Sequence, residues 1–370
     1  MQRVLAGRST DANVNPYSGV VLSSNSEIRQ LGDVAPRLMQ QDEPLLDPEF
    51  FLASVSKGWR PRVVAVYSAR EVVGILYTKE RVISGIPTGV IFADGSLGGF
   101  LLGNPLHRKN LFRVAMERLL ASPRIRGARL RVLRDSDEFE AVKGMTPSKS
   151  LDINYSEIKH NDSKLWKYHA HLPLTHTYDQ FLKGLGTATR HNFRYYRRRF
   201  EASGHSFVEH LSADQLRPVA LDFGDKSKSI HGAERLAMEG QLNLVATARR
   251  PLAIGLKHAN GEWLGVLGGW YQPGGAILCF QCNSDRNFGS DSLSVVLRGY
   301  LIELLIRQGL QELVIWGDTG PPLSRYVTYV PTIGVRLDPS AKAWRVARRL
   351  ISAVGPWLPG RLALVAQWVA

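Results

Sequence analysis

The chain has 370 residues, and its 47 lysine and arginine residues outnumber its 33 aspartate and glutamate residues, which gives a formal net charge of +14. With 44% hydrophobic and 22% charged residues, it is too apolar for a disordered chain and too polar for a membrane-embedded one. At roughly 100 to 200 residues per domain, this length predicts two or three folding units, each large enough to bury a core.

The sequence shows no pattern of a secretory signal or a membrane span. Only Val4 to Gly7 is apolar near the start before polar residues follow. The longest uncharged stretch, Trp263 to Ser284, has 22 residues, but Gln272, Pro273 and Gly274 interrupt it and favour two strands around a turn. We therefore expect a cytoplasmic protein.

The cysteines, Cys279 and Cys282, are interpreted as buried thiols of a strand. A zinc site needs a second ligand pair, and the sequence has none at the usual spacing, so no metal is expected. Residues three apart in a strand point to opposite faces about 10 Å apart, which is too far for a disulfide.

The first part of the chain predicts an irregular arm followed by a run of strands. Residues 1–45 are rich in serine, asparagine, glycine and proline and have little periodicity, with room for one short helix. Alternation then predicts strands and an amphipathic helix, in the order strand 62–67, strand 72–82, strand 89–93, helix 110–120 and strand 128–133.

The same order recurs about 185 residues later and predicts an internal repeat. Asn260 and Gly261 favour a tight hairpin because both residues accept positive φ. The elements are strand 252–258, strand 263–271, strand 276–282, helix 292–307 and strand 312–316. We predict one half over 46–160, a second over 161–335 and a tail over 336–370.

The densest charge run, 187–200, predicts a basic amphipathic helix. Its arginines are Arg190, Arg194, Arg197, Arg198 and Arg199. All but the last share one helix face, while Phe193, Tyr196 and Phe200 lie on another. The guanidinium groups repel one another, so the pattern favours an anionic partner for Arg190, Arg194, Arg197 and Arg198; a merely solvated face is the alternative.

Two motifs carry a resemblance to a known family. Arg190-His-Asn-Phe-Arg-Tyr-Tyr-Arg-Arg-Arg-Phe-Glu-Ala-Ser-Gly204, with Phe181-Leu-Lys-Gly-Leu185 before it, resembles the signature of the Fem-like tandem branch of the GNAT superfamily, which includes the cellulose-biosynthesis-type acetyltransferases. The resemblance covers the second half and makes the first a degenerate GNAT-like partner. It implies an α+β fold of two GNAT-like halves, each a mixed, mainly antiparallel sheet flanked by helices.

The resemblance also implies an acyl-coenzyme A, with an acetyl or longer acyl group, as co-substrate. A diphosphate needs unpaired N–H groups at a helix N-terminus and small residues beside it, which the turn before helix 292–307 supplies. The candidate cofactor-binding residues are Gln281, Asn283, Arg286, Asn287, Gly289, Ser290 and Ser292.

Acyl transfer to an amine requires a base and a group that protonates the leaving thiolate. Asp318 is the first candidate because it follows the last strand at the family's Gly-Asp position. Glu234 and Tyr326 are further candidates. The non-catalytic alternatives are that Glu234 is a solvated helix residue and that Tyr326 is a core residue. No Ser-His-Asp order or Walker-type loop is present, so hydrolase and nucleotidase functions are not indicated.

The sequence leaves three functions open. The first is an N-acyltransferase that uses acyl-coenzyme A and an amine of a sugar, an envelope precursor or a polysaccharide-linked acceptor. The second is a Fem-type aminoacyltransferase whose tRNA donor contacts the arginine-rich helix. The third is a non-catalytic binder of nucleic acid or of a membrane surface, to which the basic pattern of 341–354 is suited; docking of that segment on the protein core is the alternative.

Overall fold

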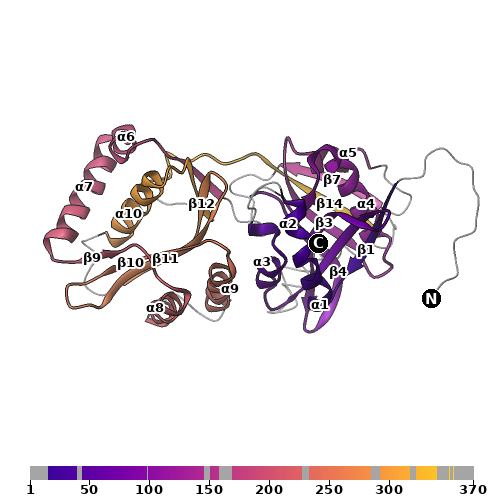
Figure 1. Cartoon of the computed structure of the whole chain (residues 1–370), viewed down its shortest axis with the longest axis horizontal. Helices are drawn as coiled ribbons and strands as arrows, with labels where there is room; N and C mark the ends of the chain where they lie inside the picture. The colour runs from indigo at the N-terminus through magenta and orange to yellow at the C-terminus, as the bar shows by residue number, and fades with distance from the viewer. Residues whose placement is uncertain are drawn as a thin grey trace, which may run out of the picture.

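The chain folds into two halves that lie side by side along its long axis (Figure 1). The computed structural model describes residues 16–39, 44–97, 99–145, 151–157, 169–226, 233–284, 292–316, 322–339, 350 and 353. Each half has one mixed, mainly antiparallel sheet with helices packed beside it. The α+β class and the two similar halves in tandem are confirmed.

The first half contains an eight-stranded sheet in the order β1-β2-β3-β4-β6-β14-β7, with β5 paired to β3 off this path. Its strands are β1 Tyr17–Leu22, β2 Trp59–Ser68, β3 Glu71–Ile83, β4 Ile86–Asp94, β5 Leu101–Gly103, β6 Gly127–Leu133, β7 Leu151–Glu157 and β14 Thr332–Pro339. Its helical segments are α1 Asn25–Arg29, η1 Gln30–Asp33, α2 Ala35–Leu38, η2 Pro44–Leu46, α3 Pro48–Ala53, η3 Pro105–His107, α4 Arg108–Leu120 and α5 Asp137–Lys143.

The second half contains a six-stranded sheet in the order β8-β13-β12-β11-β10-β9. Its strands are β8 His169–Pro173, β9 Ser206–Val208, β10 Pro251–Lys257, β11 Trp263–Gln272, β12 Gly275–Asn283 and β13 Glu312–Trp316. Its helices are α6 Tyr178–Gly184, α7 Thr187–Ala202, α8 Ala213–Lys226, α9 Ala233–Thr247 and α10 Leu293–Arg307.

The predicted repeat is present as one structural unit in each half. In the first half β2, β3 and β4 are antiparallel neighbours, α4 crosses over, and β6 pairs parallel to β4. In the second half β10, β11 and β12 are antiparallel, α10 crosses over, and β13 pairs parallel to β12. A parallel pair needs such a crossover, so each helix is placed against its sheet by the topology.

The strand β14 ties the second half to the first. It follows the last part of the second half in sequence but inserts between β6 and β7 of the first sheet, antiparallel to both. Figure 1 shows the chain running from one half to the other before it enters this strand. Its apolar residues Ile333, Val335 and Leu337 pack in the first core. Residues 332–339 therefore belong to the first half, which corrects the predicted end of the second half at 335 and the predicted start of the tail at 336.

The N-terminal arm is also more regular than predicted where it is described. β1 pairs with β2 along its whole length, and α1 begins with a capping box in which Ser24 and Glu27 bind each other's backbone N–H groups. The expectation of an irregular arm failed because the edge strand is only partly buried and carries a weak pattern. Residues 350 and 353 are all that is described of the predicted basic helix.

A β-bulge in the second sheet changes the expected placement of the cysteines. The register between β11 and β12 shifts between Gly268 and Gly269, opposite Phe280 and Leu278. Cys279 and Cys282 therefore pack in the same hydrophobic cluster rather than on opposite faces. Both are buried thiols that are not joined in a disulfide, and burial raises the pKa of Cys282 to about 11.

This bulge provides a test of the fold. A Cβ atom on Gly269 would lie 1.8 Å from the carbonyl oxygen of Ile277, whereas one on Gly240, within α9, would meet no atom within 4 Å. We predict that Gly269→Ala lowers the free energy of unfolding by about 3 kcal/mol through overpacking. Gly240→Ala should raise it by about 0.5 to 1 kcal/mol. Urea denaturation measures both, and equal effects would contradict this account of the bulge.

Candidate functional site

The parallel strands of the second half separate before β12 ends. Their pairing runs from Gly275 with Glu312 to Leu278 with Ile315. β12 then continues to Asn283, paired on its other side with β11. In the described part of the chain, the last residues of β12 thus have no ladder partner on the β13 side. Among the described residues, β12 and β13 are therefore hydrogen-bonded to each other only over the first part of β12.

In the first half, the equivalent parallel pair, β4 and β6, stays hydrogen-bonded to the end of β4. β4 and β6 pair from Val90 with Gly127 to Asp94 with Arg131, and Asp94 is the last residue of β4. One more backbone hydrogen bond, from the N–H of Gly95 to the carbonyl of Arg131 at 2.8 Å, extends this closure. The parallel pairing therefore stops before the end of β12 in the second half and reaches the end of β4 in the first.

Predicted cofactor-binding residues lie at the end of β12. Gln281 Oε1 accepts a hydrogen bond from Arg298 Nε of α10 at 3.0 Å, and Gln281 Nε2 lies 3.3 Å from Asn283 Oδ1. The bulge turns these residues toward α10. Burial lowers the pKa of the Arg298 guanidinium. Sequence reasoning missed Arg298, which is a cation on the second turn of the helix that follows the predicted turn.

The turn itself is only partly described. Ser292 precedes α10 in the left-handed conformation, with φ of 43°, and its side chain does not cap the helix. The predicted residues Arg286, Asn287, Gly289 and Ser290 lie outside the described residues, so their part in a cofactor site stays a prediction.

The predicted catalytic residues have different outcomes. Asp318 lies outside the described residues, and for Glu234 only its place in the first turn of α9 is described. Tyr326 contacts the turn that joins the two signature segments, 181–185 and 190–204. Its Oη accepts a 2.7 Å hydrogen bond from the N–H of Gly186, just before α7. This bond, with a further one from Thr189, lowers the pKa of Tyr326.

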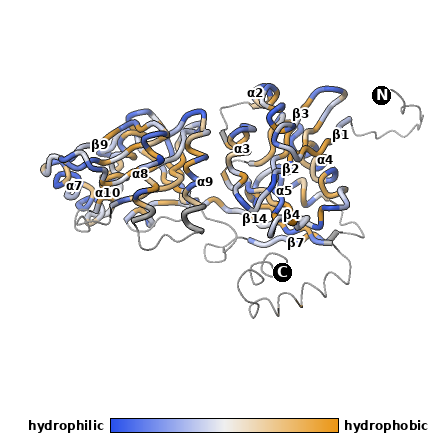
Figure 2. The backbone as a smooth tube through the Cα atoms, turned by 90° about the horizontal axis from the view of Figure 1, so that it is seen from below, coloured by the Kyte–Doolittle hydropathy of each residue, from blue (hydrophilic) through white to orange (hydrophobic). Residues whose placement is uncertain are grey.

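The arginine-rich helix is α7, which confirms the predicted element. Figure 1 places it at the outer side of the second half, and in Figure 2 it is largely hydrophilic. One predicted anion ligand, Arg197, is held within the protein: it pairs with Glu201 at 2.9 Å and Glu303 at 2.5 Å and lies over the ring of Tyr300. Its carboxylate partners raise its pKa even though burial opposes this.

The other arginines of this set form the outer face of α7. Arg190, Arg194 and Arg198 recur every fourth residue, and Arg194 has only a marginal ion pair, 4.0 Å from Asp179. Beside them, the rings of His191 and Tyr195 stack with centroids 5.8 Å apart. Tyr195 is 46% exposed, so this face offers both cations and an aromatic surface.

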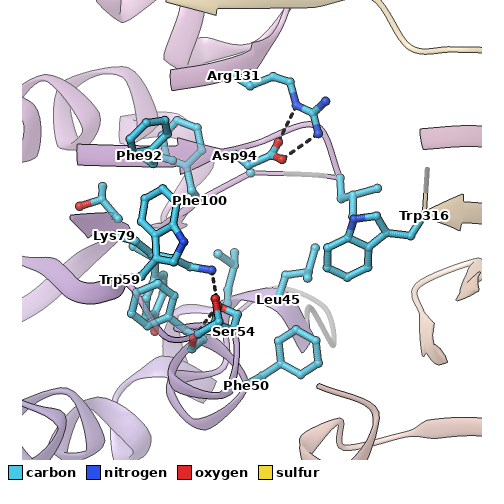
Figure 3. Close-up of a pocket in the computed structure, with 18 of the residues that line it drawn as sticks. Leu45, Phe50, Ser54, Trp59, Lys79, Phe92, Asp94, Phe100, Arg131 and Trp316 are labelled. Carbon is cyan, nitrogen blue, oxygen red and sulfur yellow. Dashed lines mark hydrogen bonds and ion pairs between the residues drawn. The ribbon is translucent and has the colours of Figure 1, made fainter. Parts of the chain in front are cut away.

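A cavity of about 340 Å³ lies on the α3 side of the first sheet. Figure 3 shows its labelled side chains around a common space: Leu45, Phe50, Ser54, Trp59, Lys79, Phe92, Asp94, Phe100, Arg131 and Trp316. Trp316 is the last residue of β13, so the second half supplies part of the wall. None of the residues predicted from sequence as catalytic or binding lies here.

An ion pair at the end of the β4–β6 pairing, between Arg131 and Asp94, also lines this cavity. Arg131 is 2% exposed and donates to both carboxylate oxygens of Asp94, at 2.8 Å and 2.7 Å. Arg131 Nη2 also lies 3.0 Å from Nε2 of His169. Burial would raise the pKa of Asp94, but the charge and hydrogen bonds of Arg131 hold it below its usual range.

Two groups on β3 face the same cavity. Lys79 Nζ donates to the carbonyl of Ser54 at 2.8 Å, and burial lowers its pKa to about 8, against the charge of Asp94. Tyr77 is 3% exposed, and its hydroxyl has no hydrogen-bond partner among the described residues. Burial raises the pKa of this phenol.

None of the described helices combines the length and the hydrophobicity of a membrane span. Among the described residues, no cluster of His, Cys, Asp and Glu side chains is arranged to hold a metal ion.

Comparisons with known proteins agree on the fold. No family model and no curated protein matches the sequence. The crystal structure of FemX matches with a TM-score of 0.58 at 11% identity, covering 85% of this chain and 96% of FemX. A conserved protein of unknown function from Bacteroides thetaiotaomicron VPI-5482 matches with a TM-score of 0.53 at 10% identity, covering 86% and 100%. The chain thus shares the fold of FemX, in agreement with the Fem-like resemblance; the cellulose-biosynthesis-type branch stays a prediction.

The lowered pKa of Lys79 predicts a pH dependence of stability. Between about pH 8 and the ordinary value of 10.5, the unfolded chain binds more protons than the folded one, so the unfolding free energy rises with pH. Lys79→Met removes this contribution. Relative to the variant, the wild type should therefore gain unfolding free energy from pH 7.5 to pH 10 in urea titrations. The control Lys109→Met, an exposed site on α4, should follow the wild-type profile; a parallel profile for Lys79→Met would contradict the prediction.

Proposed function

We propose that the protein transfers an acyl group from an acyl-coenzyme A to an amine and binds this donor in its second half. The observation that carries the proposal is the unequal closure of the two parallel strand pairs. The pairing of β12 with β13 ends at Leu278 and Ile315, before the end of β12, whereas β4 pairs with β6 up to its last residue. The first half is accordingly assigned as the degenerate partner, and the second as the transferase half.

The edge of β12 beyond Leu278 suits the extended arm of the donor. Backbone N–H and C=O groups that lack a ladder partner need hydrogen bonds, and an extended chain can supply them by adding to a strand edge. The pantetheine arm of coenzyme A is such a chain because it carries amide groups. Laid along β12, it would direct its diphosphate toward the N-terminus of α10.

The polar group at the end of β12 supports the same orientation. Arg298 provides positive charge beside Gln281 and Asn283. We assign these residues and Ser292 to the donor site, and keep Arg286, Asn287, Gly289 and Ser290 as proposed ligands of its phosphates. A phosphate held by N–H groups and a guanidinium needs no metal.

The chemistry then requires two proton transfers. The neutral amine of the acceptor attacks the thioester carbonyl, the carbon–sulfur bond breaks, and the thiolate leaves with its electron pair. Tyr326 is proposed to protonate this thiolate: Gly186 and Thr189 both donate to its Oη, so its own proton is left to donate. Asp318 and Glu234 are the proposed acceptors of the amine proton. The acceptor class is an amine of a sugar, an envelope precursor or a polysaccharide.

Substitution of Gln281 tests the donor site. Gln281→Leu removes the oxygen that orients Arg298 and should weaken binding of acetyl-coenzyme A at least about tenfold, or about 1.4 kcal/mol. Calorimetry with acetyl-coenzyme A and longer acyl-coenzyme A species measures this. The matched control Gln272→Leu, at the far end of β11, should bind like the wild type. If the wild type binds no thioester at millimolar concentration, the proposed donor is wrong.

The outer face of α7 favours a second candidate function, transfer of an aminoacyl group from tRNA. Arg190, Arg194 and Arg198 follow one another at about 6 Å along the helix, since each residue rises about 1.5 Å. Such a row can contact successive phosphates of one strand, and the exposed Tyr195 offers a stacking surface for a base. The face lies on the transferase half, where a donor would have to arrive.

A charge-neutralising variant distinguishes this candidate. The triple change Arg190→Gln, Arg194→Gln and Arg198→Gln should reduce tRNA affinity at least about tenfold at low salt and flatten its salt dependence. A control variant carries three changes in the first half, Arg113→Gln, Arg118→Gln and Arg124→Gln. It has the same net charge as the α7 variant, because each variant loses three positive charges. Filter-binding titrations at several salt concentrations measure both variants, and equal loss in the two would show only a non-specific effect of charge.

A further inference from the structure

The cavity against α3 has polar groups that the proposed acyl transfer does not use. We propose that it is a second ligand site, in the first half, for a compact amphipathic carboxylate with an apolar or aromatic body. The proposal does not rest on the proposed function, because none of the residues assigned to the donor site lines this cavity.

The charges around the cavity favour one negative charge on the ligand. Asp94 and Arg131 neutralise each other through a bidentate pair, and the other charged side chain on the wall is Lys79. The wall therefore carries net positive charge at Lys79. A partly buried charge is stabilised by a partner of opposite sign, so a carboxylate beside Lys79 would be stabilised, whereas a ligand cation would add to the imbalance.

The unused hydrogen-bond donors point to the same end of the cavity. Lys79 has three N–H donors, of which the Ser54 carbonyl takes one, and in the described structure its other contact is the ring of Phe51. The hydroxyl of Tyr77 has no partner among the described residues, a state that costs about 1 to 3 kcal/mol. Tyr77 and Lys79 are two residues apart on β3, so their side chains share one face. Both approach Phe51, with Tyr77 at 4.8 Å between ring centroids and Lys79 Nζ at 6.0 Å.

The remaining wall suits an apolar body. Aromatic rings surround the space, contributed by α3, β2, β4, the turn after β4 and β13: Phe50, Trp59, Phe92, Phe100 and Trp316 (Figure 3). Trp59 stands edge-on to Phe92, with centroids 4.8 Å apart. A volume of about 340 Å³ lies near the lower limit of small-molecule sites, which favours a ligand of one ring or a short branched chain.

A matched set of probes tests the proposed chemistry. Hydrocinnamate, hydrocinnamyl alcohol and hydrocinnamylamine share one body and differ only in the terminal group. In calorimetric titrations of the full chain at neutral pH, the acid should bind at least tenfold more tightly than the alcohol, and the amine should bind more weakly still. Equal affinity for the acid and the alcohol, or no binding of the acid at millimolar concentration, would overturn the proposal.

Two variants locate the carboxylate within the cavity. Lys79→Met should weaken hydrocinnamate binding at least tenfold, while Lys109→Met should leave it unchanged. Tyr77→Phe removes only a hydroxyl without a partner, so it should weaken the acid severalfold without lowering the thermal midpoint of the protein. The control Tyr67→Phe, on β2 and outside the cavity, should not change affinity. Unchanged affinity in both Lys79→Met and Tyr77→Phe would show that the acid binds elsewhere.

Discussion

The length over which the parallel strands stay hydrogen-bonded determines what each half of this protein can hold. In the described part of each sheet one parallel pair interrupts an otherwise antiparallel arrangement, and a single helix makes the crossover. Every backbone group along a paired edge is already satisfied and cannot receive a ligand. Pairing to the end of β4 therefore closes the first half, and separation after Leu278 leaves the second half a usable edge.

The closed pair gives the first half a different kind of site. Arg131 seals the end of the pair by binding Asp94, and both side chains lie on the face of the sheet that α3 covers. The halves are held together at the same place. Asp47, which caps α3, forms an ion pair with Arg249 at 2.6 Å, and Phe50 packs edge-on against Trp270. A cavity bordered by this contact has a wall from each half and a shape that depends on their junction.

Sequence reasoning succeeded where a local pattern determines the structure. The repeated strands and the helices α4 and α10 follow from alternation and helical spacing, because burial of one face decides each element. It failed where distant segments meet. β14 reads as the end of the second half, yet its partners are β6 and β7, and the partners of Arg197 come from its own helix and from α10. A helical wheel places Arg197 with Arg190, Arg194 and Arg198 but cannot show that Glu303 lies opposite.

The site residues divide in the same way. Gln281 and Asn283 could be proposed from their place before a helix, but their side-chain direction depends on a bulge that exchanges the faces of β12 after Cys279. Lys79 and Tyr77 gave no signal in sequence, because a lysine and a tyrosine in a long strand read as an exposed edge and a core residue. Their importance depends on α3, which covers that face of the sheet and reduces the access of water to both groups. An ammonium and a hydroxyl there are costly unless a ligand, or a change of protonation, satisfies them. In a duplicated fold, the two copies can thus differ in the edges that they leave unpaired, and the proposed ligand of the first half would lie on the face of the sheet that α3 covers.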